Sequence, residues 1–222
     1  MARPSFEPHW ALLGLPADAY PPARYRLVPM EGDALRDCVE VKEAREYDDD
    51  GQFFARGLAC PEIFGRFEPT ARRPCERDRR FGRIPLRRPV AHPLRGPLDS
   101  LRELPVLPPG LRPAAPGEPT HPVTARYTRV VRANAALAQA DHPNAFRDAY
   151  AELCHAVADL FVAPEGSLVA LLGTTPALRW ERLVRLDARA AEKLFDPVWA
   201  DDEDTHLTLA VLAALGFMVS PR

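Results

Sequence analysis

The sequence predicts an α+β fold made of a small irregular antiparallel sheet region, a helical hairpin and a C-terminal helical segment. Three observations lead to this prediction. Apolar residues recur at helical spacing in two stretches between 124 and 162, apolar and polar residues alternate in short runs before residue 100, and the 25 prolines are concentrated between 61 and 122. Hydrophobic residues make up 46% of the 222-residue chain, which is enough for a packed core.

Short strands and turns are expected in the first half of the chain. Residues 1–36 form an extended N-terminal segment rich in proline and aromatic residues, and residues 38–41 alternate as a strand does. Three aspartates and a glycine within 47–52 predict a tight turn, because these residue types favour turn geometry. Residues 81–86, FGRIPL, alternate again, and Pro85 favours an edge position for that strand.

Helices are expected in the second half, after a proline-rich linker or extended crossing segment over 101–122 that turns at Pro108-Pro109-Gly110. Two apolar stripes then predict a helical hairpin over 124–162, with Thr124 as the candidate N-cap of its first helix and Pro143 near the start of its second. The stripes are Tyr127, Val130, Val131, Asn134, Leu137 and Ala138, followed by Phe146, Tyr150, Leu153, Val157, Leu160 and Phe161.

The remaining chain, residues 163–222, is expected to be a divergent C-terminal helical region. Its patterns predict helices at 187–195 and 204–215, and Gly216 is expected to end the second of them. The organisation predicted is therefore an extended segment over 1–36, a central region over 37–162 and this C-terminal region.

Charge is unevenly distributed along a chain whose net charge is −2. Residues 66–95 hold ten arginines against three acidic residues, a net of +7, so the rest of the chain carries −9. Such asymmetry can create a local anion-binding face. Arginine is common everywhere in this chain, where Lys42 and Lys193 are the only lysines, so its abundance alone does not indicate nucleic-acid binding.

The composition indicates a cytoplasmic protein that does not contact a membrane. The first 15 residues lack the apolar core of a signal peptide, and no run of 18 apolar residues exists. The four cysteines contain no CxxC pair and are expected to be buried or free thiols rather than zinc ligands. The adjacent Cys154 and His155 are not expected to form a nucleophilic pair, since neighbouring helical residues point in different directions.

Four blocks of the sequence follow one another in a recognisable order. Residues 50–65 are DGQFFARGLACPEIFG, residues 79–93 are RRFGRIPLRRPVAHP, residues 104–113 are LPVLPPGLRP, and residues 127–161 contain YTRVVRANAAL and AELCHAVADLF. They resemble DGLFCERIFG, RRERFGHIELAxPVAHIW, LPVLPPDLRP and YRRVINRNNRL of the amino-terminal, clamp-base region of the largest (β′) subunit of bacterial DNA-directed RNA polymerase. The resemblance implies that residues 37–162 form a β′-like clamp-base region.

Two groups of residues matter most in the resembling blocks. Arg79, Arg80, Arg83, Arg87 and Arg88 either contact a nucleic-acid backbone, as the family's clamp implies, or form a solvated strand surface. The residues that match the family's motifs as scaffold are Phe64, Gly65, Phe81, Gly82, His92, Pro108, Pro109, Arg112, Tyr127 and Asn134. Among them, Asn134 is expected to be a satisfied buried hydrogen bonder and His92 a structural turn histidine.

The departures from the family are large. Its four-cysteine zinc ribbon is replaced by RFEPTARRPCER, where Cys75 alone cannot hold zinc. Its long coiled-coil clamp insertion is reduced to residues 94–103, and its catalytic signature NADFDGD is missing. The acidic clusters at 48–50 and 201–204 are expected to be a solvated turn and an acidic helix start rather than a magnesium site. No catalytic residue, zinc, magnesium or small-molecule substrate is therefore expected of this chain alone.

Three functions are compatible with these features. The first is a non-catalytic, transcription-associated binding module that docks on polymerase subunits, on DNA or on both. The second is a divergent subunit of a split DNA-directed RNA polymerase, active only with a partner chain that supplies the catalytic aspartates. The third is a repurposed accessory or immunity-type scaffold without a transcriptional role, an alternative that the unmatched residues 163–222 keep open.

Overall fold

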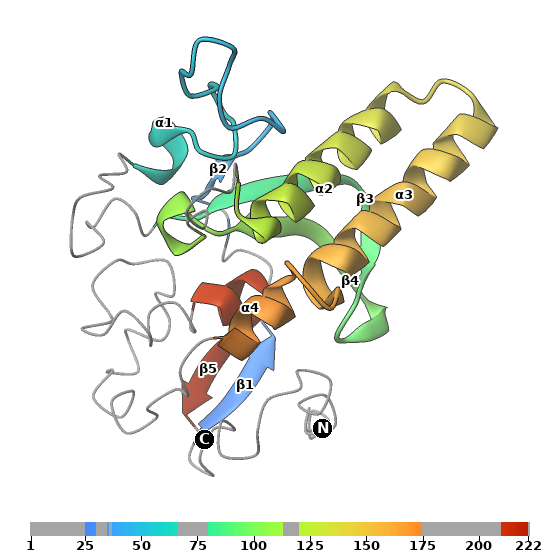
Figure 1. The fold of residues 1–222 in the computed structure, drawn as a ribbon. Helices are drawn as coiled ribbons and strands as arrows, with labels where there is room; N and C mark the ends of the chain where they lie inside the picture. The colour runs from blue at the N-terminus through green and yellow to red at the C-terminus, as the bar shows by residue number, and fades with distance from the viewer. Residues whose placement is uncertain are drawn as a thin grey trace.

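The computed structural model describes residues 25–29, 35, 37–65, 80–112, 120–174 and 210–221 (Figure 1). These residues have the α+β class, so the predicted class is confirmed. The expected helix at 187–195 lies outside the described residues, as do most of the extended segment 1–36 and the first part of the expected helix at 204–215.

A three-stranded sheet forms the centre of the described fold. Its strands are β2 (Val39–Glu40), β3 (Gly82–His92) and β4 (Gly96–Val106), in the order β2-β3-β4. The β3–β4 pair is antiparallel, but β2 runs parallel to β3, so the sheet is mixed and differs in this pair from the antiparallel sheet expected. A second, two-stranded antiparallel sheet joins β1 (Tyr25–Pro29) to β5 (Phe217–Pro221), which links segments close to the two ends of the sequence.

Prolines lie within both long strands, β3 and β4. Pro85 lies in β3 beyond Gly82 and Arg83, the two residues that pair with β2, so it occupies a local edge of the described sheet, as expected; the register shift between Pro85 and Val90 also tolerates a residue without an N–H group. Residues 101–106, part of the expected linker or extended crossing segment, complete β4. The strand tolerates Pro105 because β4 is an edge strand of the described sheet.

The turn between β3 and β4 is short. His92 is paired with Gly96, the Arg95 N–H donates to the His92 carbonyl oxygen at 3.3 Å, and Gly96 has a φ of 86°, a value that favours glycine. The two strands are therefore joined directly at the place where the resembling family carries its long clamp insertion.

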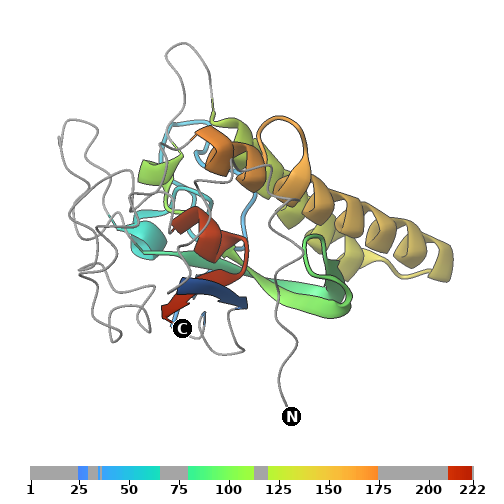
Figure 2. The same cartoon turned by 90° about the horizontal axis from the view of Figure 1, so that it is seen from below.

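A helical hairpin covers one face of the sheet. It consists of α2 (Pro122–Gln139) and α3 (Pro143–Val162), and Figure 2 shows both helices lying over the β3–β4 hairpin and projecting beyond it. His121, not Thr124, is the N-cap of α2, since its Nδ1 accepts from the Val123 N–H at 3.2 Å. The equivalent cap of α3 is His142, and proline follows the cap in both helices, where its missing N–H is tolerated.

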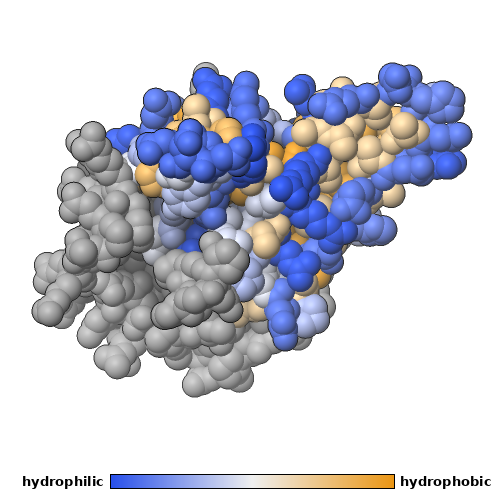
Figure 3. Space-filling model, turned by 45° about the horizontal axis from the view of Figure 1, so that its top comes forward, coloured by the Kyte–Doolittle hydropathy of each residue, from blue (hydrophilic) through white to orange (hydrophobic). Residues whose placement is uncertain are grey.

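Ion pairs and apolar packing hold α2 against α3. Arg129 on α2 binds Glu152, with Nε 2.7 Å from Oε1, and also pairs with Asp159. The predicted stripes are buried over most of their length, except that Ala138 is exposed on α2. Figure 3 shows the outer surface of the hairpin as a pale, weakly hydrophobic band between hydrophilic residues.

One apolar core connects the described elements. The short helix α1 (Pro61–Phe64) contributes Phe64, the sheet contributes Ile84 and Leu104, and the helical hairpin contributes residues such as Tyr127 and Leu160. The chain re-enters this core at residues 210–215, all buried, after α4 (Leu168–Thr174). Residues 210–214 are helical and are followed by Gly216 with a φ of 82°, which agrees with the expected end of that helix.

No helix in the part of the chain that the structure describes is long and apolar enough to cross a membrane.

Candidate functional site

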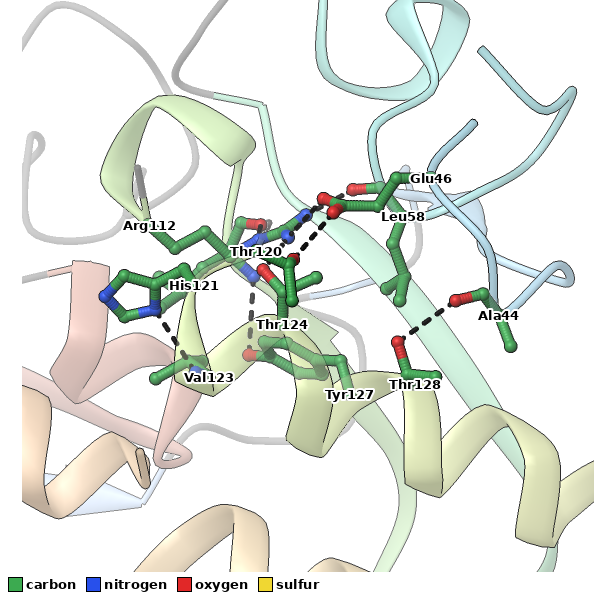
Figure 4. Close-up of polar contacts among 11 residues, drawn as sticks. Ala44, Glu46, Leu58, Arg112, Thr120, His121, Val123, Thr124, Tyr127 and Thr128 are labelled. Atoms are coloured by element: carbon green, nitrogen blue, oxygen red, sulfur yellow. Dashed lines mark hydrogen bonds and ion pairs between the residues drawn. The ribbon is translucent and has the colours of Figure 1, made fainter. Parts of the chain in front are cut away.

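The buried guanidinium of Arg112 is the polar centre of the fold (Figure 4). Arg112 follows the 3₁₀ turn η4 (Pro109–Leu111), which places its side chain at the start of α2 with no exposed surface. Its Nε donates to the Leu107 carbonyl oxygen at 2.9 Å, and its Nη1 lies 3.3 Å from Glu46 Oε1. It also donates to the Leu58 carbonyl oxygen and the Thr124 hydroxyl.

Aromatic rings and helix α2 complete this centre. The Arg112 guanidinium carbon lies 5.8 Å from the centre of the Phe64 ring and 6.0 Å from that of Tyr127. The Tyr127 hydroxyl donates to the Pro105 carbonyl oxygen at 3.0 Å, and the Thr120 hydroxyl donates to the second carboxylate oxygen of Glu46 at 2.8 Å. Segments that extend from Glu46 to Tyr127 along the chain therefore meet at one cation.

The electrostatics of the centre are those of a structural ion pair. Burial lowers the pKa of Arg112, and the carboxylate of Glu46 opposes this effect. Burial also raises the pKa of the Tyr127 hydroxyl, which stays a neutral hydrogen-bond donor. The hydrogen bonds of this centre join protein donors to protein acceptors, so the centre fixes the positions of the segments that supply them.

The β3 bulge is held by side chains from the helical hairpin. Where β3 leaves its pairing with β4, the Arg87 N–H donates to Asn134 Oδ1 at 2.8 Å, and Asn134 Nδ2 donates to the Pro85 carbonyl oxygen at 2.9 Å. Tyr150 on α3 donates through its hydroxyl to the Pro89 carbonyl oxygen at 2.8 Å. The side chains of α2 and α3 thus replace the ladder hydrogen bonds that the bulge gives up.

The five arginines singled out in the sequence have different environments. Arg79 lies outside the described residues, while Arg80 and Arg87 are exposed. Arg88 is exposed too, and its guanidinium carbon lies 5.5 Å from the centre of the Phe146 ring. Arg83 is committed to the scaffold: its Nε donates to the Cys38 carbonyl oxygen at 2.9 Å and its Nη1 pairs with Glu103 at 3.1 Å. The structure therefore leaves Arg80, Arg87 and Arg88 exposed and uses Arg83 in the scaffold.

The glycine and phenylalanine residues of the first two blocks pack against one another. Gly65 ends α1 with a φ of 91°, and Phe64 and Phe81 are buried. A Cβ atom at Gly82 would lie 2.8 Å from Val41 Cγ2 and 3.1 Å from Phe64 Cζ, so only glycine fits without displacement. Pro108 and Pro109 begin the 3₁₀ turn that leads to Arg112.

His92 joins the end of β3 to the C-terminal segment. Its Nδ1 accepts from the Leu94 N–H at 3.1 Å, and its Nε2 lies 3.0 Å from the Leu215 carbonyl oxygen, which requires the proton on Nε2. The ring is buried and meets the Phe161 ring edge-on, with 5.2 Å between ring centres. This position serves packing and not catalysis, because both ring nitrogens are engaged with the backbone.

No metal site is formed by the described residues, which hold no group of three or more histidine, cysteine, aspartate or glutamate side chains placed to bind an ion. Cys38, Cys60 and Cys154 are free thiols, and burial raises the pKa of Cys38 to about 11, which makes its thiol unreactive. Cys75 and the acidic residues 201–204 lie outside the described residues. The expected absence of zinc and magnesium stays a prediction.

Sequence reasoning missed the partners of the motif residues. Glu46, Thr124 and Tyr150 each provide a hydrogen bond that fixes a motif segment, yet none of them was singled out for such a role. The one available signal was for Glu46, because a buried arginine generally needs a carboxylate nearby.

Comparison with known proteins gives no relative from which a function could be transferred: no family model, no curated protein and no solved structure matches this chain.

Replacing Asn134 by alanine is expected to lower the free energy of unfolding by about 1–2 kcal/mol, because two hydrogen bonds to the β3 bulge are lost at a partly buried position. Urea unfolding measures the loss, and hydrogen exchange of the Arg87 amide reports whether the bulge has loosened. Asn144→Ala, at an exposed position on α3, is the control and should change stability by less than about 0.5 kcal/mol. An Arg87 amide equally protected in Asn134→Ala would contradict the role of Asn134.

Proposed function

We propose that this chain is a non-catalytic, β′-like binding module that docks on the transcription apparatus. The observation that carries the proposal is the convergence of the resembling blocks on one centre. Phe64 comes from the first block, Arg112 from the third and Tyr127 from the fourth, and the two rings lie 5.8 and 6.0 Å from the Arg112 guanidinium carbon. The second block, on β3, is tied to the fourth by Asn134.

Convergence supports the proposal because separate short matches have no reason to meet in space. A chance match of LPVLPPGLRP would need neither a buried arginine nor an aromatic residue supplied by another block. The tight turn between β3 and β4 supports it further, since a scaffold that has lost an insertion would close in this way. Fold alone does not establish function, and the docking role therefore needs a direct test.

Contact with nucleic acid is proposed at the exposed arginines of the second block, Arg80, Arg87 and Arg88. A guanidinium group binds phosphate oxygens with two parallel hydrogen bonds and releases counterions on binding. Arg83 is left out of this surface because Cys38 and Glu103 already occupy its donors.

Affinity purification of the full chain from its native host, with mass spectrometry, tests the docking role. Core polymerase subunits are expected among the retained proteins. A DNA mobility shift at low salt tests the arginine surface, with Arg87→Ser/Arg88→Ser expected to weaken the shift and Arg147→Ser on α3 as the exposed-arginine control. Absence of polymerase subunits together with absence of a DNA shift would refute the proposed function.

A further inference from the structure

A pair of exposed aromatic rings lies on an acidic hairpin that is distant in sequence from the β3 bulge of Arg87 and Arg88. Tyr47 and Phe53 face each other across an antiparallel bridge, with ring centres 5.0 Å apart and an interplanar angle of 37°. Their exposed fractions are 51% and 43%, high for side chains that pack against each other. The hairpin is the blue loop that rises above the rest of the fold in Figure 1. We call residues 47–53 the aromatic tip.

The aromatic tip is internally fixed. The Asp48 carboxylate accepts from the Asp50 N–H at 3.0 Å and from the Gln52 N–H at 2.8 Å, and the Asp48 N–H donates to the Gln52 carbonyl oxygen at 2.9 Å. Gly51 has a φ of 74°, and so allows the sharp turn. The two rings are therefore presented in one arrangement before any partner arrives, which lowers the entropic cost of binding.

The base of the hairpin is anchored in the buried centre. The Phe54 N–H donates to the Glu46 carbonyl oxygen at 3.1 Å, and the Glu46 side chain is held by Arg112 and Thr120. Glu46 therefore connects the base of the aromatic tip to the buried centre. Rigid support of this kind is what a docking point requires.

Exposed aromatic pairs differ from exposed aliphatic residues in what they indicate. Single exposed apolar residues such as Leu98, at 99% exposure, are ordinary on protein surfaces. Aromatic rings, by contrast, dominate the binding energy of protein interfaces because they contribute large area at a small cost in conformational entropy. The paired rings of Tyr47 and Phe53 are thus the described surface feature best suited to dock a protein.

The charge of the aromatic tip selects its partner. Asp48, Asp49 and Asp50 lie in the turn between Tyr47 and Phe53, and residues 46–55 contain no basic residue, although Arg45 and Arg56 flank this stretch. A guanidinium group can stack on a ring and pair with a neighbouring carboxylate, whereas a phosphate group is repelled. The chain itself uses ring stacking of this type at Arg45, whose guanidinium carbon lies 4.0 Å from the centre of the Phe54 ring.

We propose that the aromatic tip is the docking point for an arginine-bearing segment of another protein. The proposal rests on the proposed binding-module function and adds the surface and the partner's chemistry. A symmetric contact between two copies is disfavoured, because it would bring two sets of three aspartates together.

Site-specific photo-crosslinking in the native host tests this proposal. The photoreactive amino acid p-benzoyl-phenylalanine replaces Phe53 in the full chain, and the same group at Leu98 is the matched control. Position 53 is expected to capture one protein at a peptide that contains arginine, and position 98 is expected to capture it at least about tenfold less. Equal capture at both positions, no capture, capture of nucleic acid or capture of a second copy would each overturn the proposal.

Substitutions supply an independent readout. Tyr47→Ser/Phe53→Ser should reduce retention of the crosslinked protein at least about tenfold, while Leu98→Ser should leave it unchanged. Asp49→Asn/Asp50→Asn leaves the Asp48 cap in place and should weaken retention and its dependence on salt. Unchanged unfolding midpoints establish that these variants fold, and unchanged retention by Tyr47→Ser/Phe53→Ser would contradict the proposal.

The two proposals fail in different ways. Retention of polymerase subunits without crosslinking from position 53 would overturn the docking point and leave the proposed function standing. Crosslinking from position 53 to an arginine-bearing segment of a protein outside transcription would overturn the proposed function and leave the docking point standing.

Discussion

Replacing Arg112 by methionine is expected to lower the free energy of unfolding by about 3–5 kcal/mol, because it removes the cation from a buried network and takes a donor from each of its acceptors. The Leu58 and Leu107 carbonyl oxygens and the Glu46 carboxylate would each lose a partner. A loss of this size is a large share of the 5–15 kcal/mol that typically separates folded from unfolded domains.

Urea unfolding of matched variants measures the effect. Arg102→Met, at an exposed position on β4, removes the same chemical group and should cost less than about 0.5 kcal/mol. Arg112→Lys keeps the charge but cannot donate in several fixed directions, so its stability should lie between wild type and Arg112→Met, and it remains measurable if the methionine variant does not fold. Equal stability of Arg112→Met and Arg102→Met would show that the centre does not hold the fold together.

The helical hairpin was predictable because its signal is local. The apolar stripes of α2 and α3 repeat at helical spacing over several turns, and prolines mark both helix starts. The cap of α2 was misjudged because histidine is an uncommon N-cap, and Thr124 three residues later is a commoner one. The turn at 47–52 was predictable for the same local reason, since aspartate and glycine carry turn geometry in their own side chain and backbone.

The sheet was predictable only in part because strand pairing depends on residues distant in sequence. The prolines of residues 101–122 favoured a linker or extended crossing segment, and nothing local indicates that Pro105 would be accommodated at an edge. The parallel pairing of β2 with β3 and the joining of β1 to β5 are equally non-local.

The polar centre was likewise predictable in its motif residue but not in the distant residues that contact it. Arg112 could be singled out from its motif, but several acidic residues between 40 and 50 could have supplied its partner, and only packing selects Glu46. Likewise, Arg83 and Arg87 are indistinguishable in the sequence, yet one is bound by Glu103 and the other is exposed.

Acidification is expected to destabilise the fold through His92. Burial, reinforced by the nearby charge of Arg95, lowers the pKa of His92 from 6.5 to about 4, against the opposing effects of the Leu215 carbonyl hydrogen bond and of Asp99. The unfolded chain therefore binds a proton between about pH 6.5 and pH 4 that the folded chain does not bind. The contribution of neutral His92 is fully present above pH 6.5 and is lost as the pH falls toward 4.

The size of this effect follows from the difference between the two pKa values, 6.5 and about 4. At 1.36 kcal/mol per pKa unit, it amounts to about 3 kcal/mol. The structural reason is that a protonated imidazole could no longer accept the hydrogen bond from the Leu94 N–H, and would stand as a buried cation close to Arg95.

Urea unfolding of wild type and His92→Gln from pH 8 to pH 4 isolates the contribution, because glutamine does not titrate. The wild type should lose about 3 kcal/mol more than His92→Gln over this range, even if the variant is less stable at pH 8. His155→Gln makes the same exchange at an exposed histidine of α3 and is the matched control. Parallel profiles for wild type and His92→Gln would mean that His92 titrates alike in the folded and unfolded states, and that burial does not hold it neutral.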